Sequence, residues 1–344
     1  MNQPLISIVI PTYRRPQSLK RSILSAARQT LRALKIIVCD NASNDTTREV
    51  VLKLQKEDAR IHYIEQPQNI GMIANYSYGM SVVDTPYFSF LSDDDLLLPE
   101  FCEKALQQFK LYPEIAFAAG STLIIDEHRR IVADPIRMWP REGLYQPPES
   151  FLEMIGKYPV PNTVLFHKQF VDSSLIDASI PSMWDCDFLL KIAAQYPIAI
   201  FKDPSCIFFH QPESFTYEVP FQSSIQALQK MIANIACNPH LSKMVKEKAV
   251  DALQHQMARD AYRWMLKSVL RNDGKLYSLC KGYLVQAKHN GKIRFLAINL
   301  IHRLLQTTPF LAIAPQGVQK LKRWLRPSLS EPIKAWVEKV GPLP

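Results

Sequence analysis

The stretch Tyr87-Phe88-Ser89-Phe90-Leu91-Ser92-Asp93-Asp94-Asp95 joins an apolar run to three consecutive carboxylates. The run has the length and composition of a buried strand, and the carboxylates repel one another unless solvent or a cation surrounds them. Mg²⁺ is usually held by one or two carboxylates together with substrate phosphates, and open α/β sheets bind ligands at the carboxyl ends of their strands. The stretch therefore indicates a strand that ends at a cation and a nucleotide diphosphate. A solvated loop of charges is the alternative that the triplet alone leaves open.

The first 120 residues alternate between strand-like and helix-like patterns. Each apolar, β-branched segment is followed by polar turn residues and then by apolar residues at helical spacing. Alternation of this kind builds a parallel sheet that is covered on both faces. The expected strands are 5–10, 36–39, 61–64 and 87–91, and the expected helices are 18–29, 46–55, 72–82 and 99–111.

The pattern changes twice further along the chain. Up to residue 220 it is less regular, and after Pro220 it is nearly all helical. We therefore expect an α/β domain over residues 1–219 and a helical C-terminal region over residues 220–344. The expected strands are 122–125, 164–166, 198–201 and 207–209, and the expected helices are 150–157, 184–195, 225–237, 243–271, 276–288 and 293–306.

The composition of the 344 residues, with 47% hydrophobic and 21% charged residues, is that of a globular protein with a core. Six cysteines are scattered without a CxxC pair, which argues against a zinc ribbon or a disulfide scaffold and favours a reducing, cytoplasmic location. The chain opens without the pattern of a secretory signal. No run of 18 uncharged apolar residues occurs, so we expect no transmembrane helix.

The net charge of +9 is unevenly distributed. Residues 1–239 carry 22 Lys and Arg against 26 Asp and Glu, whereas residues 240–344 carry 19 against 6. The segments 292–305 and 320–326 mix these cations with large apolar residues, as helices in a membrane interface do. We expect contact with an anionic membrane surface, and the alternative is that these helices pack on the first domain or on a second subunit. No nucleic-acid reading element accompanies the charge, so we expect no nucleic-acid partner.

Polar residues follow the first three expected strands. Thr12, Tyr13 and Arg14 end the first, and Asp40 ends the second. Asp40 could accept hydrogen bonds from a base or a ribose, and Tyr13 could stack on a base, although such residues also serve as plain turn residues. Asn69-Ile70-Gly71, after the third strand, is a weaker indication, because a glycine at a helix entry normally serves the backbone.

A second acidic pair, Asp185 and Asp187, lies at the start of an expected helix. Carboxylates there cap backbone N–H groups, but one of them could also act as a general base. His210 follows a strand and could be a metal or phosphate ligand, or an ordinary histidine without such a role. GxGxxG after a strand, GxxxxGK[ST], HExxH and GxSxG are all absent, and 10 glycines fit poorly with Gly-rich phosphate loops.

Four ordered motifs resemble family 2 glycosyltransferases of the GT-A fold over about residues 5–215. The resemblance implies a Rossmann-like, mostly parallel α/β sheet for the first domain. It is specific for the family and says nothing of the sugar. The motifs are residues 7–15 with Leu19, residues 36–45, residues 69–71 with Asn75, and residues 90–95 followed by Pro99.

The resemblance also implies roles for individual residues. Two departures from the family pattern stand beside them: Ser92 replaces the first Asp of the acidic motif, and Trp184 replaces a Glu before the base. Asp185 falls where the family has its catalytic base. The implied nucleotide-binding residues are Pro11, Thr12, Tyr13, Arg14, Asp40, Asn69 and Asp93, and the implied metal ligands are Asp94, Asp95 and His210.

The sequence therefore predicts a metal-dependent, inverting glycosyltransferase that uses Mn²⁺ or Mg²⁺. The expected donor is a nucleotide-diphosphate sugar, a UDP-sugar first among them, and the expected acceptor is a glycan or a lipid-linked sugar in surface polysaccharide synthesis. A retaining course would need a nucleophile on the other face of the sugar, and no residue offers itself. A nucleotidyltransferase and a non-catalytic module that binds sugar nucleotides or glycans are the alternatives.

Overall fold

The computed structural model describes residues 3–126, 128–180, 182–209, 220–270, 273–286, 333–334 and 336–337. The chain forms two compact units, which we describe separately. The first consists of Met1–Ser179, Trp184–Tyr217 and Pro327–Pro344, and the second of Ile180–Met183 and Glu218–Arg326. The end of the chain thus groups with the N-terminal unit.

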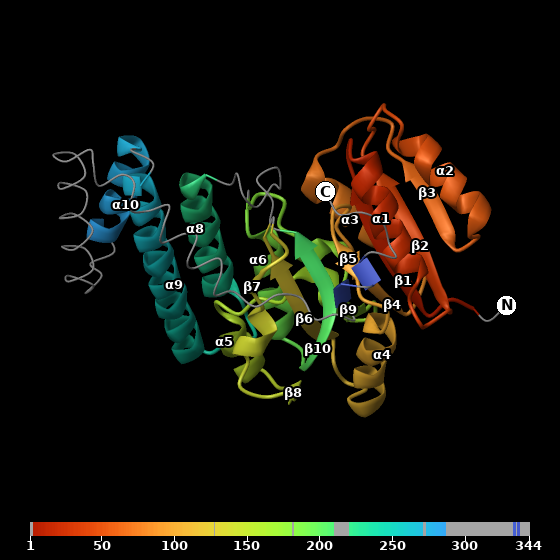
Figure 1. The fold of residues 1–344 in the computed structure, drawn as a ribbon. Helices are drawn as coiled ribbons and strands as arrows, with labels where there is room; N and C mark the ends of the chain where they lie inside the picture. The colour runs from red at the N-terminus through yellow and green to blue at the C-terminus, as the bar shows by residue number, and fades with distance from the viewer. Residues whose placement is uncertain are drawn as a thin grey trace. The chain divides into compact units, whose positions relative to one another are not determined.

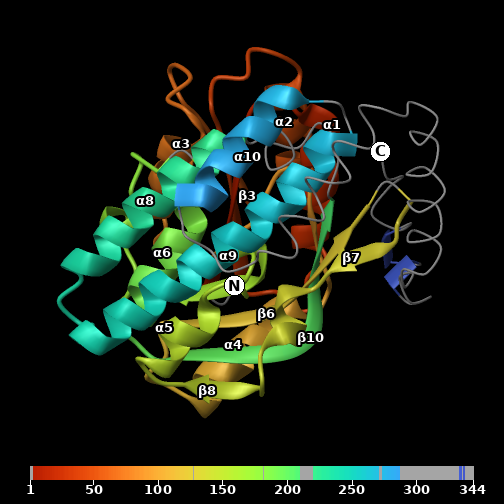
Figure 2. The same cartoon turned by 90° about the vertical axis from the view of Figure 1, so that its left-hand side faces the viewer.

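A mixed sheet lies at the centre of the first unit (Figure 1). Its strand order is β3-β2-β1-β4-β9-β6-β10-β5, and Figure 2 shows β7 and β8 extending it beside β6 and β10. β3, β2, β1 and β4 run parallel, as do β6 and β10, whereas β5, β7, β8 and β9 pair antiparallel with their neighbours. The strands are β1 (Ile6–Thr12), β2 (Leu34–Asp40), β3 (Ile61–Glu65), β4 (Tyr87–Phe90), β5 (Leu96–Leu97), β6 (Phe117–Ile125), β7 (Ile131–Ala133), β8 (Gly143–Tyr145), β9 (Val164–His167) and β10 (Ile198–Phe209).

The strand predictions for the first 120 residues are confirmed to within two residues at each end. The separate strands predicted at 198–201 and 207–209 are wrong, because both belong to β10. Its pairing with β6 shifts register around Pro204, and a proline is tolerated inside a sheet at such an irregularity. The predictions also lack β5, β7 and β8, which have two or three residues each and are too short to show a period.

Helices cover both faces of this sheet because alternate residues of a strand point to opposite sides. Ile8 of β1 shares a core with Leu19 of α1 and Phe101 of α4. Its neighbour Val9 faces α3, so closely that a Cβ on Gly79 would lie 2.5 Å from the Cγ1 atom of Val9. The helices are α1 (Pro16–Ala27), α2 (Thr47–Glu57), α3 (Met72–Ser81), α4 (Phe101–Leu111), α5 (Glu149–Met154) and α6 (Trp184–Ala193).

Aromatic contacts place α6 on the same face as α3. Phe90 pairs with Val9 across β1 and β4, and the ring of Tyr76 on α3 lies 5.1 Å from its ring. Phe166 of β9, on the same face, lies 5.5 Å from the ring of Phe188 on α6. The result is a three-layer unit with α1, α2 and α4 on one face and α3 and α6 on the other.

Described residues near the C-terminus pack on the sheet of the first unit. Val337 is 3% exposed and belongs to an apolar cluster with Leu96 of β5 and Ile207 of β10, against which Ile333 and Trp336 also pack. The indole Nε1 of Trp336 donates a hydrogen bond of 3.3 Å to the carbonyl of Leu97. This segment therefore supports β5, which follows the acidic triplet directly.

Replacing Val337 by aspartate should destabilise the first unit. The variant would bury a carboxylate among apolar side chains without a partner, at a cost of about 2–4 kcal/mol. We expect the unfolding temperature in a thermal melt to fall by roughly 5–10 °C. Val285→Asp is the matched control, because Val285 is 62% exposed. Equal melting temperatures of the two variants would show that the C-terminal segment adds nothing to stability.

The second unit contains three helices within its described residues: α8 (Phe221–Cys237), α9 (Lys243–Leu270) and α10 (Gly274–Gln286). Phe221 of α8 lies 6.5 Å from the ring of Trp264 on α9 and 6.1 Å from that of Tyr283 on α10. These helices match three of the predicted ones, whereas the predicted helix 293–306 and the basic segment 320–326 lie outside the described residues. Among the helices that are described, none combines the length and apolar character required to cross a bilayer.

Candidate active site

The topology brings the first and fourth strands of the unit together. β1 lies between β2 and β4, so the chain builds the sheet outward from β1 in one direction and then in the other. Such a switch point leaves a crevice at the carboxyl ends of the two central strands, where open α/β sheets bind ligands. Thr12 ends β1, and the acidic triplet follows β4.

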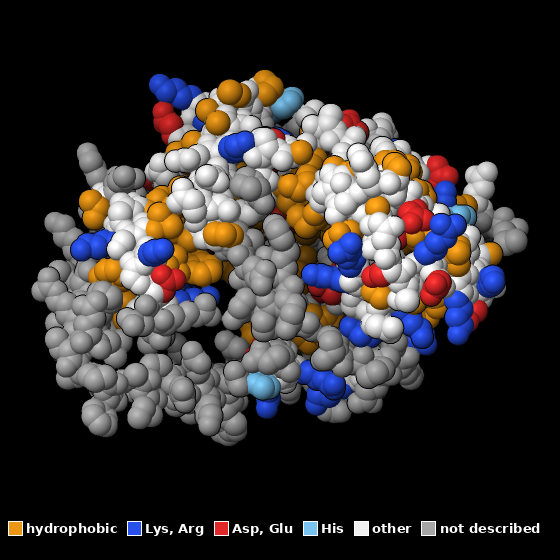
Figure 3. All heavy atoms as spheres, turned by 90° about the horizontal axis from the view of Figure 1, so that it is seen from above, with side chains coloured by type: hydrophobic (Ala, Val, Ile, Leu, Met, Phe, Trp, Pro, Cys, Tyr) orange, Lys and Arg blue, Asp and Glu red, His pale blue; other side chains and the backbone are white. Residues whose placement is uncertain are grey.

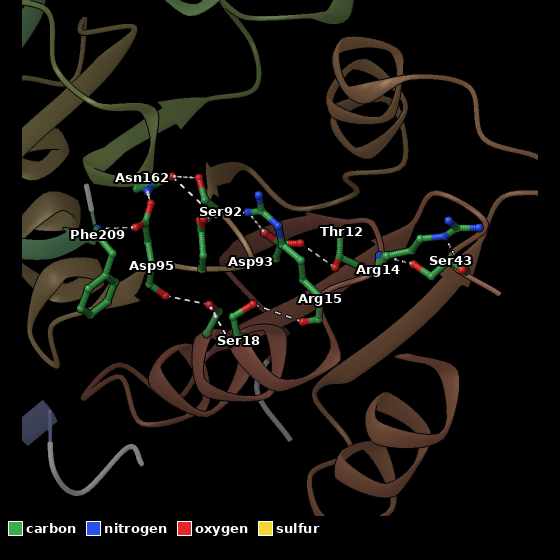
Figure 4. Close-up of polar contacts among 12 residues, drawn as sticks. Thr12, Arg14, Arg15, Ser18, Ser43, Ser92, Asp93, Asp95, Asn162 and Phe209 are labelled. Carbon is green, nitrogen blue, oxygen red and sulfur yellow. Dashed lines mark hydrogen bonds and ion pairs between the residues drawn. The ribbon is translucent and has the colours of Figure 1, made fainter. Parts of the chain in front are cut away.

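Asp93 connects these two strand ends. The hydroxyl of Thr12 donates a hydrogen bond of 2.7 Å to Oδ2 of Asp93. Nη1 of Arg15 lies 3.3 Å from Oδ1 of Asp93 and 2.7 Å from Oδ2 of Asp94. Figure 4 shows Asp93 facing Thr12 and Arg15, while Asp95 points the other way. Two predicted motifs, 81 residues apart, therefore meet at one point, and Arg15 joins them.

Asp95 is held inside the protein. Its Oδ1 accepts a hydrogen bond of 2.9 Å from the backbone N–H of Phe209, and its Oδ2 accepts one of 2.5 Å from Nδ2 of Asn162. Oδ1 of Asn162 in turn accepts a bond of 3.1 Å from the N–H of Ser92 (Figure 4). Asn162 thus ties together both ends of the acidic loop. The surroundings of the fully buried Asp95 suit this structural role better than the predicted role of metal ligand.

Burial and neighbouring charge raise the pKa values of Asp93 and Asp95. Burial and then the charge of Asp94 raise the pKa of Asp93 to about 6, against the opposing effect of Arg15. Burial and the charge of Asp94 also raise the pKa of Asp95. A carboxyl whose pKa is higher in the folded than in the unfolded protein lowers stability as pH rises through that interval. Near neutral pH this cluster therefore costs stability, and an added positive charge would relieve that cost.

Of the three carboxylates, Asp94 is the one that a divalent cation could reach if Arg15 moved aside. The Asp94 side chain is 27% exposed, compared with 10% for Asp93, and Asp94 is thus the most accessible of the three carboxylates. The described residues contain no group of three His, Cys, Asp or Glu side chains arranged to hold a metal. A cation that keeps waters and binds substrate phosphates needs only one or two protein carboxylates. The predicted ligand His210 lies outside the described residues.

The loop after β2 surrounds Asp40, which is 1% exposed. Oδ1 of Asp40 accepts hydrogen bonds from the N–H and the hydroxyl of Ser43, at 3.1 and 2.5 Å. Its Oδ2 accepts a bond of 2.6 Å from the hydroxyl of Tyr63. The hydroxyl of Ser43 also accepts a bond from the N–H of Arg14, so this network fixes the loops after β1 and β2 relative to each other. The predicted contact of Asp40 with a base would have to share these oxygens.

Asn69 fixes the loop before α3. Its Oδ1 accepts hydrogen bonds of 2.9 Å from Nδ2 of Asn41 and from the N–H of Gly71. Gly71 has a φ of 88°, which a residue with a side chain rarely adopts. Of the other predicted pocket residues, Pro11 is buried within β1, whereas Tyr13 is 38% exposed and the guanidinium of Arg14 lies 5.1 Å from the centre of its ring.

Asp185 is the second residue of α6, where the helix N-terminus favours a carboxylate. Burial raises its pKa, against hydrogen bonds from its own N–H and that of Cys186. Asp187 is different, because it is 2% exposed and forms an ion pair of 2.7 Å with Lys191 one turn later. Asp185 is therefore the better placed of the two to take a proton from a ligand.

Two aromatic residues link α6 to the acidic loop. The ring of Trp184, next to Asp185, lies 5.0 Å from the ring of Tyr76, and the hydroxyl of Tyr76 lies 3.5 Å from the hydroxyl of Ser92. Tyr76, Arg15 and Asn162 are site residues that the sequence predictions lack. Arg15 had a signal, since it belongs to the first quoted motif, whereas Asn162 belongs to none.

Residues 7–165 match the family that is described as "Glycosyl transferase family 2". This part of the chain is a family 2 glycosyltransferase domain. A relative in Methanocaldococcus jannaschii named as an uncharacterized glycosyltransferase is 27% identical over 59% of this chain and 70% of its own length. The GalNAc(5)-diNAcBac-PP-undecaprenol beta-1,3-glucosyltransferase of Campylobacter jejuni is 38% identical over 36% of this chain and 40% of its own length.

Solved structures confirm that this glycosyltransferase domain has a GT-A-like fold. A crystal structure of residues 1–349 of S. aureus TarS with UDP-GlcNAc aligns with a TM-score of 0.61 at 12% identity, over 82% of this chain and 89% of that chain. A Pyrobaculum calidifontis mannosyltransferase in complex with GDP-Man and Mn²⁺ aligns with a TM-score of 0.51 at 11% identity, over 89% and 87%. Both alignments cover a larger share of the chain than residues 7–165.

Proposed function

We propose that this protein transfers a sugar from a nucleotide-diphosphate sugar to a hydroxyl group of a glycan or a lipid-linked acceptor, with inversion at the anomeric carbon. The observation that carries the proposal is the meeting of Thr12, Arg15 and the acidic triplet at the switch point of a family 2 domain. Fold neighbours that bind UDP-GlcNAc or GDP-Man support a nucleotide-sugar donor here.

In this proposal the donor lies across the carboxyl ends of β1, β2 and β4. Tyr13 stacks on the base, the loop around Asp40 holds the nucleoside, and Asp94 faces the diphosphate. A divalent cation bound there would offset the charge that develops on the departing diphosphate. Asp93, held by Thr12, stays fixed beside this position.

Asp185 is the proposed general base. Its carboxylate takes the proton of the acceptor hydroxyl while that oxygen attacks the anomeric carbon from the side opposite the diphosphate. The bond to the diphosphate breaks in the same displacement, which inverts the configuration. The raised pKa of Asp185 supports this assignment, because a general base works best when its pKa approaches the working pH.

Release of nucleotide from donor sugars tests the proposal. Purified protein with Mn²⁺ and a UDP-sugar should release UDP slowly through transfer to water, and removal of Mn²⁺ by EDTA should stop the release. A binding module would bind the donor without releasing UDP. A nucleotidyltransferase would instead split the diphosphate and release a sugar phosphate, so detection of that product would refute the proposal.

The proposed acceptor side rests on two observations. The Campylobacter jejuni relative is named for a substrate linked to undecaprenol through a diphosphate, and residues 240–344 of this chain hold 19 Lys and Arg against 6 Asp and Glu. A basic, partly apolar region would hold the enzyme at an anionic bilayer surface, where lipid-linked sugars are found. We therefore propose peripheral binding at the cytoplasmic face of a membrane.

Co-sedimentation with phosphatidylglycerol vesicles tests this membrane proposal. Truncation of the C-terminal region is a poor test, because Val337 packs on the first unit. A triple variant with glutamine at Lys320, Lys322 and Arg323 keeps that contact. We expect at least tenfold weaker vesicle binding at low salt, since each cation near an anionic surface contributes about 1 kcal/mol. If the wild-type protein does not co-sediment with these vesicles at low salt, the membrane role is excluded.

A further inference from the structure

Arg15 lies at the crevice where the donor is proposed to bind, unlike Lys104, which also contacts two carboxylates, those of Glu100 and Asp203. Lys35 and Arg48 each pair with a single acidic side chain, Asp84 and Glu65. Figure 3 shows basic and acidic side chains interspersed over the face that it presents, which is the distribution expected of surface ion pairs. Arg15 instead contacts two neighbouring carboxylates through one nitrogen atom, at the crevice where the donor is proposed to bind.

The position of Arg15 conflicts with that of a cation. Nη1 of Arg15 lies 2.7 Å from Oδ2 of Asp94, whose side chain is the most accessible of the triplet. Mg²⁺ binds its oxygen ligands at about 2.0–2.1 Å. A cation on this oxygen would therefore come close to the guanidinium, and the two positive charges would repel each other. The charge of Arg21, on the next turn of α1, also acts on Asp94.

The bonds that hold Arg15 at the start of α1 are made by its backbone. Its backbone carbonyl accepts hydrogen bonds from the N–H of Leu19, at 3.0 Å, and from the hydroxyl of Ser18, at 3.2 Å. These bonds fix the start of α1, whereas the side chain of Arg15 is 36% exposed. A guanidinium binds phosphate as well as it binds carboxylate. It therefore has a second partner available as soon as a diphosphate enters the crevice.

We propose that Arg15 is the counter-ion of Asp93 and Asp94 in the ligand-free enzyme. When the nucleotide diphosphate binds with its cation, Arg15 leaves these carboxylates and binds the phosphates. The inference rests on the proposed donor site. It assigns an order of binding: the cation binds Asp94 firmly only together with the diphosphate, because only then does Arg15 leave. Arg15 acts as a positioning residue that keeps the empty site from holding metal.

Titration of Mn²⁺ alone into nucleotide-free protein, followed by the EPR signal of free Mn²⁺, tests this inference. Arg15→Gln should bind Mn²⁺ at least tenfold more tightly than the wild type. The same variant should bind UDP at saturating Mn²⁺ at least tenfold more weakly, because the guanidinium no longer meets the diphosphate. These opposite changes distinguish a displaced counter-ion from a purely structural ion pair, whose loss would not tighten Mn²⁺ binding.

Two further variants make the result specific. Arg263→Gln removes the same charge from an exposed pair with Asp260 and should leave Mn²⁺ binding unchanged. Arg15→Lys keeps the charge without the planar guanidinium and should fall between the wild type and Arg15→Gln, which also covers a failure of Arg15→Gln to fold. Unchanged or weaker Mn²⁺ binding by both Arg15 variants would overturn the inference. A wild type that binds no UDP even with Mn²⁺ would instead overturn the proposed function.

Discussion

Asp185→Asn should lower turnover by roughly 10²–10⁴, which is the usual contribution of general acid–base catalysis. Asparagine keeps the size of the side chain at the second position of α6 but cannot take the acceptor proton. Because the donor is bound by other elements, the affinity for UDP should stay within about twofold of wild type. Steady-state kinetics with saturating donor, together with a UDP titration, separates the two effects.

Asp187→Asn is the matched control for this prediction. Asp187 is buried in an ion pair with Lys191, so its replacement should lower the unfolding temperature. The turnover of the folded variant should stay close to that of the wild type. If Asp185→Asn kept most of its activity while Asp187→Asn lost it, the role of base would belong to Asp187.

The pH dependence of turnover gives a second readout on Asp185. A general base must be deprotonated, and burial raises the pKa of this carboxyl. As the pH decreases, turnover should therefore fall. The pH at which half of the turnover is lost should be higher than the pKa of an ordinary aspartate. The acidic limb of the profile should be lost in Asp185→Asn.

Asp94→Ala should abolish measurable transfer and weaken the binding of UDP in the presence of Mn²⁺ by at least tenfold, about 1.4 kcal/mol. Asp94 is the carboxylate that remains accessible to a cation, because Asp93 is held by Thr12 and Asp95 by Asn162 and Phe209. Isothermal titration of UDP with and without Mn²⁺ measures the effect.

Asp84→Ala is the control for Asp94→Ala, since the side chain of Asp84 is 64% exposed and pairs only at the surface with Lys35. It should leave UDP binding unchanged. Asp95→Ala should instead lower the unfolding temperature, because it leaves Asn162 and the N–H of Phe209 without their acceptor. Undiminished UDP affinity of Asp94→Ala in Mn²⁺ would remove Asp94 from the metal site.

Much of this fold can be predicted from the sequence because its long elements have a clear period. The strands around Val9 and Phe90 are mostly apolar, with only the small buried Ser7 and Ser89 inside them, as suits strands covered on both faces, and polar residues mark their ends. The switch point between β1 and β4 does not appear in the sequence, since strand order depends on which faces the helices cover. The docking of Ile333, Trp336 and Val337 onto the sheet cannot be predicted either, because a short apolar stretch does not show which surface it will meet.

In the candidate site, too, some residues can be predicted from the local sequence, whereas others depend on the three-dimensional fold. Thr12 and Asp93 stand at strand ends and are predicted from their position. The sequence does not show which of the adjacent Arg14 and Arg15 faces the carboxylates; a φ of 55° at Arg14 turns the chain so that Arg15 does. Asn162 belongs to a short 3₁₀ turn without periodicity, and only the fold brings it to Asp95.

The stability of the protein with nucleotide sugars is the most direct test of a donor site at this sheet edge. UDP-, GDP- and TDP-sugars would each be added with Mn²⁺ in a thermal-shift assay, with EDTA in a parallel series. We expect the sugars of one nucleotide, UDP before the others, to raise the unfolding temperature in Mn²⁺, since a ligand at 100 times its dissociation constant stabilises by about 2.7 kcal/mol. In EDTA the same sugars should raise it far less. Unfolding temperatures that no nucleotide sugar changes, with or without Mn²⁺, would contradict the account.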